Sequence, residues 1–205
     1  MLIIFQCMNV GHAQSTDRAR AHIVSIVLSK VEVRHDEFSV CSQYGCNKIT
    51  NLTIAKAAWK NIISLFEVAS LSSRHERALL AEYIARMEQY VGRETHTQFD
   101  HAGTFPVFIN VKKHKSDQMD CIDESINTLS YLKILDSEGL INYHNISGLV
   151  TRGGISAGYP HTAVLLEDKL SSKKYVIDSW FFDNGRPAVV VPYELWKRCW
   201  KPDSL

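Results

Sequence analysis

The run QMDCIDES at residues 118–125 decides the fold, because a clear helical period begins inside it. From Cys121 to Ser137, apolar residues recur every three or four positions, which predicts a helix closed by Gly139. The apolar stripe consists of Ile122, Ile126, Leu129, Leu132 and Leu135. We expect this face to be buried, so that Cys121 is held at the start of a rigid element.

Cys121 stands in the first turn of this helix, at the positive end of the helix dipole. That position favours the thiolate, which is the nucleophilic form of cysteine. The acidic neighbours Asp120, Asp123 and Glu124 act in two directions. They complement the helix dipole and can cap the helix, but their charge opposes that of a thiolate.

The C-terminal part of the chain changes to the period of strands. Residues 161–167 (HTAVLLE) predict a strand, 168–173 a polar turn and 174–178 (KYVID) a returning strand. A third strand is expected over 188–191, and a short terminal helix over 193–200. This pattern predicts an antiparallel sheet that follows the Cys121 helix in sequence.

The predicted hairpin has a chemical consequence for His161 and Asp178. In an antiparallel pair, the start of the first strand lies beside the end of the second, so these two residues become neighbours. Asp178 can then accept a hydrogen bond from the imidazole, and the other ring nitrogen can face Cys121. That is the nucleophile, base and orienting group of covalent acyl transfer.

The N-terminal half is mainly helical in pattern. A β-branched stretch over 21–33 predicts a strand, and two helices follow, at about 53–69 and about 73–91, the second ended by Gly92. A polar connection over 93–118 then leads to the Cys121 helix. Helices first and an antiparallel sheet later predict one α+β domain over 14–205, of which 118–205 is the catalytic core.

Three motifs carry a resemblance to a known superfamily. They are Asp-Cys-Ile-Asp-Glu at the helix start, His-Thr-Ala-Val on one strand and Tyr-Val-Ile-Asp-Ser-Trp on the next. Together they resemble the transglutaminase-like branch of the papain-like fold, and most closely the bacterial transglutaminase-like cysteine proteinases. The resemblance covers residues 118–180, under a third of the chain. A wider pattern, from Cys41 through Glu76-Arg77 to Trp180, resembles an uncharacterised family of exported proteobacterial proteins.

The resemblance implies a papain-like core and acyl transfer through Cys121, His161 and Asp178. Related bacterial proteinases that need calcium keep open a weak calcium role for the acids beside Cys121. The chain also departs from the pattern: Ala163 stands where an aromatic residue is common, and 118–119 lack the glycine often found before the cysteine.

Two further residues are candidates for the acyl site. Gln118 can donate to an oxyanion, as a glutamine upstream of the cysteine does in papain-like enzymes, although its spacing here is shorter. The backbone N–H of Cys121 is the alternative donor, since it lies at a helix start. Trp180 can line the site beside Asp178.

Each candidate also has a purely structural interpretation when taken alone. A lone cysteine in a helix is usually a buried core residue. His161 follows a proline and can be a loop histidine, and Asp178 can be a turn residue. His144 is expected in a loop before the hairpin, with a structural role. Cys199 is expected to be an unreactive, partly buried thiol.

Cys41 and Cys46 enclose a short polar loop, Ser-Gln-Tyr-Gly. Such a pair can close a disulfide in an oxidising compartment. Two alternatives remain at this point: half of a zinc site, for which no second pair of ligands is evident, or two unrelated reduced thiols.

The N-terminus and the overall charge bear on location. Residues 1–13 resemble the end of a secretory signal cut after Ala13, and a frayed tail is the alternative. The net charge is +1, so no global field attracts nucleic acid. No apolar run reaches the roughly 20 residues that a membrane-spanning helix needs. A periplasmic or secreted bacterial protein is expected.

These patterns favour an exported cysteine hydrolase or acyltransferase, peptidase-like or amidase-like, that forms a thioester. Its substrate would be a protein or a cell-wall peptide, and no cofactor or metal is expected. One alternative is a non-catalytic periplasmic binding or scaffold protein with a degenerate site. Another is a metal protein that uses Cys121, His161 and Asp178 as ligands.

Overall fold

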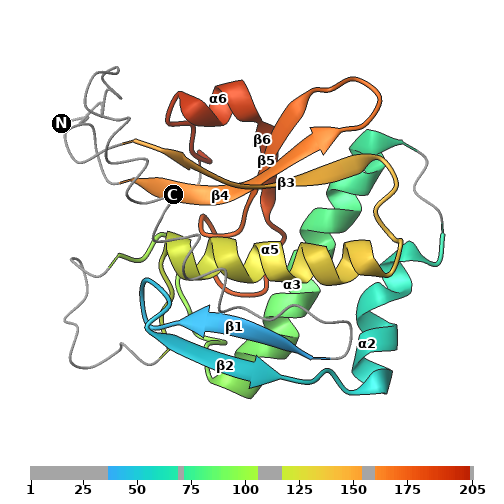
Figure 1. The fold of residues 1–205 in the computed structure, drawn as a ribbon. Helices are drawn as coiled ribbons and strands as arrows, with labels where there is room; N and C mark the ends of the chain where they lie inside the picture. The colour runs from blue at the N-terminus through green and yellow to red at the C-terminus, as the bar shows by residue number, and fades with distance from the viewer. Residues whose placement is uncertain (1–36, 69–71, 106–116, 154–159, 204–205) are drawn as a thin grey trace.

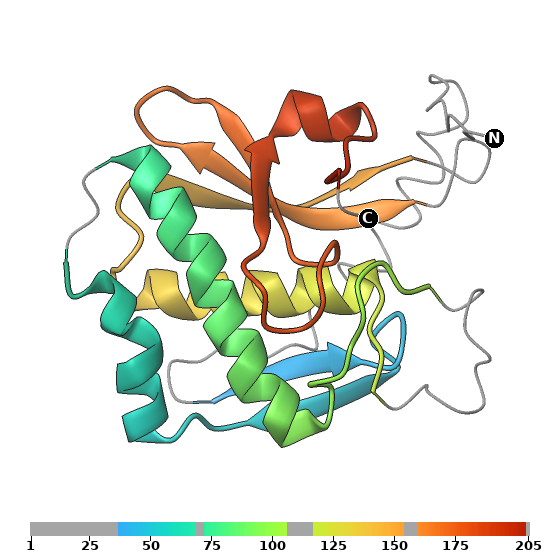
Figure 2. The ribbon, with the colours of Figure 1, turned by 180° about the vertical axis from the view of Figure 1, so that it is seen from behind.

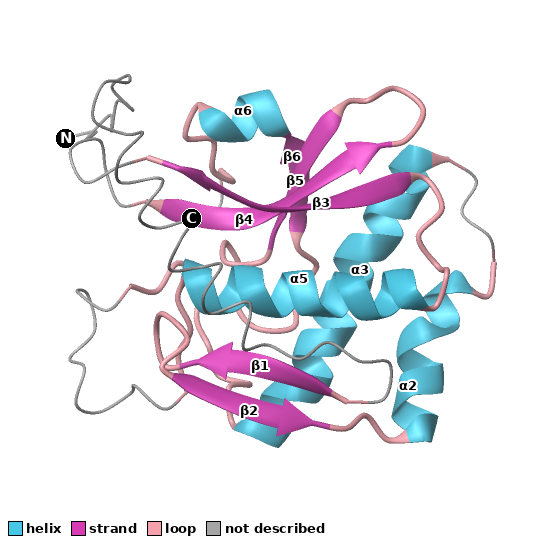
Figure 3. Cartoon of the chain, in the orientation of Figure 1, coloured by secondary structure: helices cyan, strands magenta, loops and turns pink. Residues whose placement is uncertain are grey.

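A computed structural model describes residues 37–68, 72–105, 117–153 and 160–203. The signal-like stretch 1–13 and the expected strand over 21–33 lie outside these residues. The described chain is α+β, as predicted. A four-stranded antiparallel sheet, a two-stranded hairpin and several helices make up the structure (Figures 1 and 3).

Helix α5 (Cys121–Ser137) occupies the centre of the molecule. It lies between the four-stranded sheet on one side and the hairpin of β1 and β2 on the other, with α3 crossing it on a third side (Figures 1 and 2). Its predicted bounds are confirmed, but its burial is not limited to one stripe. Polar residues such as Asn127 and Thr128 are buried too, because the helix is covered from several directions.

The four-stranded sheet has the order β3-β4-β5-β6. Its strands are β3 (His144–Arg152), β4 (His161–Asp168), β5 (Lys174–Asp178) and β6 (Val189–Pro192). The predicted hairpin of β4 and β5 is confirmed. The expectation of a loop around His144 is wrong, because this residue opens β3, whose ladder with β4 contains a register shift at Ile146 and Gly148.

The two faces of this sheet pack against different helices. On one face, Val164, Leu166 and Ile177 join the main core with α3 and α5. On the other, Ala163, Leu165, Val176 and Val191 surround Trp196 of the short helix α6 (Tyr193–Lys197). Successive residues of β4 point to opposite faces of the sheet, so its continuous apolar run contributes to two cores, one on each face.

A second, smaller sheet was not predicted. It is the hairpin of β1 (Phe38–Ser42) and β2 (Lys48–Leu52), whose connecting loop contains Cys46. All five residues of β1 are buried, because this strand packs on α5. The disulfide loop is thereby held next to the N-terminal end of α5.

Of the two N-terminal helices, the first is shorter than expected and the second is longer. The first consists of α2 (Lys56–Ile63) and a 3-10 turn, η1 (Ser64–Phe66). The second, α3 (Ser73–Thr95), has the predicted N-cap at Ser72 but continues past Gly92 to a left-handed cap at His96. Gly92 therefore lies inside the helix and does not end it. A glycine is needed there because the chain after the helix passes so close that a Cβ would stand 3.0 Å from the Cα of Gln98.

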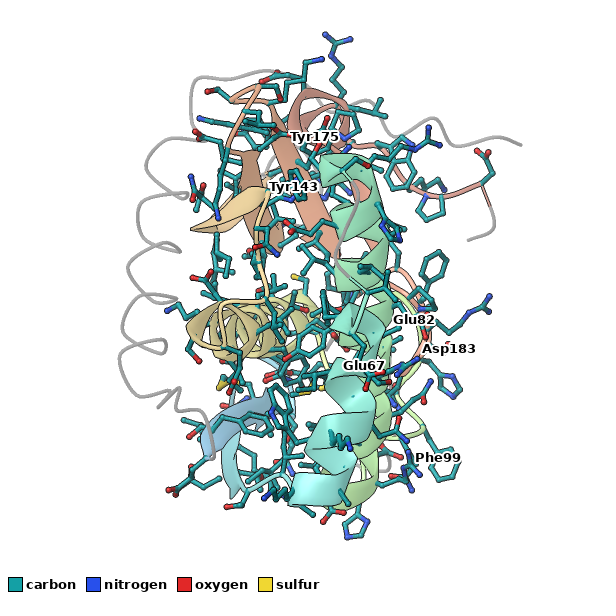
Figure 4. The ribbon with its side chains drawn as sticks, turned by 90° about the vertical axis from the view of Figure 1, so that its right-hand side faces the viewer. Glu67, Glu82, Phe99, Tyr143, Tyr175 and Asp183 are labelled. Carbon is teal, nitrogen blue, oxygen red and sulfur yellow. A yellow bond between two sulfur atoms is a disulfide. The ribbon has the colours of Figure 1, made fainter. Side chains whose placement is uncertain are left out.

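Side chains on the outer face of α3 and of the following loop include Glu82 and Phe99, which point away from the body (Figure 4). Tyr143 and Tyr175 both lie near the opposite end of the molecule, where α3 begins (Figure 4). None of the described helices is both long and apolar enough to cross a membrane.

Candidate active site

His161 and Asp178 form a direct hydrogen bond. Nε2 of the imidazole lies 2.6 Å from Oδ2 of the carboxylate, and both side chains are buried. The β4–β5 ladder ends at Val164 and Ile177, so the two residues are diagonal neighbours just past its end and not direct partners. The pairing expected from the hairpin is present, with this difference in register.

The imidazole is enclosed by aromatic rings, whose centroids lie 4.5 Å away for Trp180, 5.3 Å for Phe181 and 5.7 Å for Trp196. The indole N–H of Trp196 also donates to Oδ2 of Asp178, over 2.9 Å. Nδ1 of His161 is buried and makes no hydrogen bond within the described structure. The ring is thus fixed through Nε2, and Nδ1 is the nitrogen left to act on a neighbouring group.

Cys121 is the first residue of α5 and the one described cysteine that is not in a disulfide. Its side chain is buried, with the whole residue 2% exposed. Sγ lies 3.8 Å from the carbonyl oxygen of Pro160, the residue that precedes His161. The thiol is therefore beside the start of β4, although Sγ and Nδ1 of His161 do not form a hydrogen bond here.

The helix start at Cys121 is fixed by a capping box. Asp120 is the N-cap, and its Oδ1 accepts from the backbone N–H groups of Ile122 and Asp123. In return, Oδ2 of Asp123 accepts from the backbone N–H of Asp120, over 3.2 Å. This reciprocal arrangement satisfies donors that have no partner within the helix.

Asp123 also holds the disulfide loop. Its two carboxylate oxygens accept from the backbone N–H of Tyr44 over 2.7 Å and of Cys46 over 2.6 Å. Burial raises the pKa of Asp123 well above its usual value, as does the negative charge of Asp120, while the backbone donors oppose that rise. Asp123 is therefore a buried link between the helix start and the disulfide loop, and not an exposed charge beside Cys121.

The Cys41–Cys46 pair forms the predicted disulfide, with 4.6 Å between the Cα atoms. The two sulfur atoms and a carboxylate oxygen of Asp123 are close enough to be considered as metal ligands. However, zinc binds cysteine as a thiolate, and sulfur in a disulfide is not one. The disulfide is thus the arrangement that the structure contains. Cys199 is also disulfide-bonded, so the expectation of a free thiol at this position is wrong.

The hydrogen bond between His161 and Asp178 also bears on the metal alternative. Two ligand atoms of one zinc ion each lie about 2 Å from the metal, on different sides of it. A direct contact of 2.6 Å between Nε2 and Oδ2 leaves no room for an ion between these two atoms. Any shared metal would require His161 to turn away from its present partner.

Gln118 is close to the site, but its amide is already engaged. Nε2 donates to the carbonyl oxygens of Phe99 over 2.9 Å and Asp117 over 3.3 Å, and Oε1 accepts from the backbone of His101. The side chain therefore organises the loop after α3. To donate to an oxyanion, as predicted, the amide would have to release these carbonyl groups.

Trp180 covers the imidazole of His161, in agreement with a place in the lining of the site. Its indole N–H donates to the carbonyl of Thr104 over 3.1 Å, and its own carbonyl accepts from Gly103. The ring of Phe105 packs against it at 4.7 Å. The loop after α3 is thus attached to the end of β5 next to the histidine.

A group of three buried carboxyl residues lies under this site and was not predicted: Glu88 of α3, Asp100 of the following loop and Glu124 of α5. Glu124 is the middle one, because both of the others affect its pKa. The hydroxyl of Ser179 donates to Glu124 over 2.5 Å. We call these three residues the carboxyl cluster.

Each member of the carboxyl cluster is also tied to a backbone segment. Asp100 accepts from the N–H of Met119 over 2.6 Å, and Glu88 from that of Gly185 over 2.8 Å. Burial raises the pKa of Asp100 to about 10 and that of Glu124 to about 7, and raises that of Glu88 as well. The cluster therefore retains protons at neutral pH, which lets one carboxyl group donate to the next.

At the far end of the four-stranded sheet, His144 belongs to a second buried network. Its Nδ1 lies 2.8 Å from Oε1 of Glu76, and its Nε2 lies 3.1 Å from the guanidinium of Arg77. Glu76 also accepts from the backbone N–H groups of Asn142 and Tyr143. These contacts join α3 to β3, so the structural role expected for His144 is supported by its partners.

Comparisons of the chain with protein-family models, with curated proteins and with solved structures found no match. The candidate site therefore has to be judged on its own geometry.

Proposed function

We propose that this protein is a cysteine hydrolase or acyltransferase with Cys121 as nucleophile, His161 as base and Asp178 as the group that orients the base. One observation carries the proposal. Nε2 of a buried histidine is bound to a carboxylate, and its Nδ1 has no hydrogen bond, next to a helix that begins with a reduced cysteine. This is the combination that covalent acyl transfer needs.

In the proposed reaction, the Cys121 thiolate attacks the carbonyl carbon of an amide and forms a C–S bond. The negative carbonyl oxygen would be stabilised by the backbone N–H of Cys121, with Gln118 as a second donor if its amide is released. As the C–N bond breaks, Nδ1 of His161, which has taken the proton of the Cys121 thiol, gives that proton to the leaving amine. Water then attacks the thioester and gives a proton to Nδ1, and the C–S bond breaks to release the carboxylic acid and the Cys121 thiolate.

The order of elements supports a papain-like, transglutaminase-like core as part of the proposal. The cysteine begins a buried helix, and the histidine and aspartate follow on successive antiparallel strands. A peptidase or amidase is favoured over a cross-linking enzyme, because no feature of residues 37–68, 72–105, 117–153 or 160–203 suggests a site for a second, amine substrate. A disulfide is typical of exported proteins, and a protein or cell-wall peptide in the periplasm or outside the cell is the proposed substrate.

One observation favours a second candidate, a non-catalytic binding or scaffold protein with a degenerate site. Cys121 is buried, its sulfur lies near the Pro160 carbonyl, and Nδ1 of His161 makes no hydrogen bond to it. In the catalytic proposal, a small movement at the start of β4 brings Sγ and Nδ1 together, since such contacts are often long before substrate binds.

Thiol reactivity distinguishes the two candidates. In the full chain, the catalytic proposal expects iodoacetamide to label Cys121 faster than it labels an ordinary thiol, and His161→Ala to slow this labelling at least tenfold. Cys121→Ser gives the background, and the exposed His101→Ala is the matched control. Ordinary labelling that His161→Ala leaves unchanged would decide for the non-catalytic protein.

The same assay, run with added calcium and with a chelator, tests the calcium alternative. In the structure, Asp120 and Asp123 bind backbone N–H groups and Glu124 binds a hydroxyl group. A calcium site would have to replace these donors. We therefore propose a reaction that needs no cofactor, and expect equal rates in both solutions.

A further inference from the structure

Arg152, the last residue of β3, lies beside the proposed catalytic pair with its side chain buried. It is the direct partner of His161 in the β3–β4 ladder, so both side chains leave the same face of the sheet. They meet the same two rings. The guanidinium lies 4.5 Å from the ring centre of Trp196 and 5.7 Å from that of Phe181, both of which also pack against the imidazole.

The guanidinium is anchored on α6. Nη1 donates to the carbonyl oxygen of Trp196 and, over 2.8 Å, to that of Trp200. Both acceptors are neutral main-chain groups, so the positive charge of Arg152 is not cancelled by them. Because the indole of Trp196 binds Asp178, one tryptophan connects the arginine to the carboxylate that orients His161.

The charges around Cys121 make this cation important. The titratable side chains close to Cys121 include Asp120, Asp123, Glu124, Arg152, His161 and Asp178. Four of these are acids, and although burial favours the protonated forms of Asp123 and Glu124, a thiolate would still add a negative charge next to the carboxylate that orients His161. Burial lowers the pKa of Arg152 to about 10, and the negative charges of Asp178 and Cys121 act against this lowering. The guanidinium therefore stays charged at neutral pH and interacts with both anions.

We propose that Arg152 is a positioning residue of this site, whose charge offsets that of Asp178 and favours the thiolate of Cys121. The inference rests on the proposed function, because it assigns Arg152 to the same thiol and imidazole. A buried cation stabilises a nearby anion more strongly than an exposed one, since little water screens the interaction. Its anchor on Trp196 also keeps Asp178 in line with the imidazole.

The experiment measures thiolate formation directly, because Cys121 is buried and labelling also depends on access. The ultraviolet absorbance of the thiolate is followed against pH in the full chain, with Cys121→Ser subtracted. Arg152→Gln removes the charge but keeps amide donors for the two carbonyl groups, whereas Arg152→Lys keeps the charge. We expect Arg152→Gln to raise the midpoint by about one pH unit, which is about tenfold less thiolate below it, and Arg152→Lys to shift it much less.

An unchanged midpoint in Arg152→Gln, or an equal shift in both variants, overturns the inference. His161→Ala in the same titration tests the proposed function separately. If only His161→Ala raises the midpoint, the result supports the proposed triad and rejects the role of Arg152. If only Arg152→Gln raises it, the result supports the effect of the Arg152 charge and rejects His161 as the partner of the thiol.

Removal of a buried cation can also unfold the chain, which circular dichroism would reveal. In that case the double variant Arg152→Gln/Asp178→Asn, which removes one cation and one anion together, is compared with Asp178→Asn alone. The inference then requires the double variant to have the higher thiolate midpoint. Equal midpoints in these two proteins overturn it.

Discussion

The carboxylate of Asp123 accepts a hydrogen bond from the backbone N–H of Cys46 over 2.6 Å, and so joins the first turn of α5 to the disulfide loop. The same loop is held a second time by Asn127, which accepts from the N–H of Cys41 and donates to its carbonyl. The start of the helix that carries Cys121 therefore depends on a loop about 80 residues earlier in the chain. Changes in either part are expected to affect the other.

Asp123→Asn tests this link. One oxygen of Asp123 accepts from the N–H of Cys46, and the other accepts from the N–H groups of Tyr44 and Asp120. In the asparagine variant an NH2 group replaces one of these oxygens and faces a backbone N–H, so at least one hydrogen bond is lost. We expect a loss of about 2 kcal/mol in the free energy of unfolding, measured by urea titration. Asp136→Asn, at an exposed position near the other end of α5, is the control.

The disulfide and Asp123 are further expected to be coupled. Replacing both Cys41 and Cys46 by Ser should itself cost about 2 kcal/mol for a loop of this size. In a double-mutant cycle, the two losses should sum to more than the loss in the combined variant, because each change already loosens the same loop. Strict additivity would show that the loop and the helix start are independent.

Trp196→Phe removes the second hydrogen bond to Asp178 but keeps an aromatic ring in the α6 core. Of the two hydrogen bonds described, the carboxylate then keeps the one to His161, and if the proposed function holds, iodoacetamide should label Cys121 about tenfold more slowly. Trp200→Phe is the matched control. The carbonyl oxygen of Trp200 accepts a hydrogen bond from Arg152, and this main-chain contact is retained in the variant. Equal rate losses in the two variants would refute a specific role for the Trp196 indole.

The parts of the site that could be predicted from the sequence were those set by local pattern. The helical period placed Cys121 at a helix start, and the two strand-like runs joined by a polar turn predicted the hairpin that brings His161 to Asp178. Arg152 could not be recognised in this way, because β3 has a weak alternation, a glycine and a register shift. Once β3 is known to pair with β4, the position of Arg152 opposite His161 follows directly.

The carboxyl cluster could not be predicted for a different reason. Glu88, Asp100 and Glu124 come from two helices and a loop, and a single sequence gives no sign that they meet. From the sequence, Glu124 is an acid at the start of a helix, whose charge complements the helix dipole and opposes a thiolate. Because α5 is covered on all sides, Glu124 is buried in the core. A buried carboxyl group has to be protonated or hydrogen-bonded, since an unpaired buried charge would destabilise the fold.

The buried network of Glu76 predicts sensitivity to acid. Burial alone would raise the pKa of Glu76, but the hydrogen bonds from His144 and from the backbone of Asn142 and Tyr143 lower it from 4.5. A carboxyl group with a lowered pKa in the folded state stabilises the protein above the unfolded value and loses this effect as pH falls. We therefore expect unfolding free energy to decrease progressively below about pH 4.5.

Glu76→Gln should remove much of this dependence and cost about 3 kcal/mol at neutral pH, since it leaves His144 without its carboxylate. Glu82→Gln, which breaks only an exposed contact with Arg86 on the same helix, should change the unfolding free energy by less than about 1 kcal/mol. Urea titrations at several pH values measure both. A Glu76→Gln variant with the same acid profile as the parent protein would show that other carboxylates cause the acid sensitivity.

The carboxyl cluster predicts the opposite behaviour at alkaline pH. Burial raises the pKa of Glu124 to about 7 and that of Asp100 to about 10, so both bind protons more tightly in the folded state than in the unfolded state. Their stabilising effect is complete below the unfolded pKa values of about 4 and is lost as pH rises through the folded ones. The melting temperature should therefore fall by several degrees between about pH 7 and about pH 10.

Asp100→Asn separates this effect from general alkaline unfolding. The amide keeps an oxygen for the N–H of Met119 and can still donate to Glu124, but it cannot ionise. We expect this variant to lose less stability over the same pH range, measured by thermal unfolding. Asp183→Asn is the matched control, because Asp183 is exposed and accepts from the backbone N–H of Ala102 in the same loop. If the two variants follow the same pH profile, Asp100 does not hold its proton in the folded state as the structure implies, and its ionisation does not cause the alkaline loss of stability.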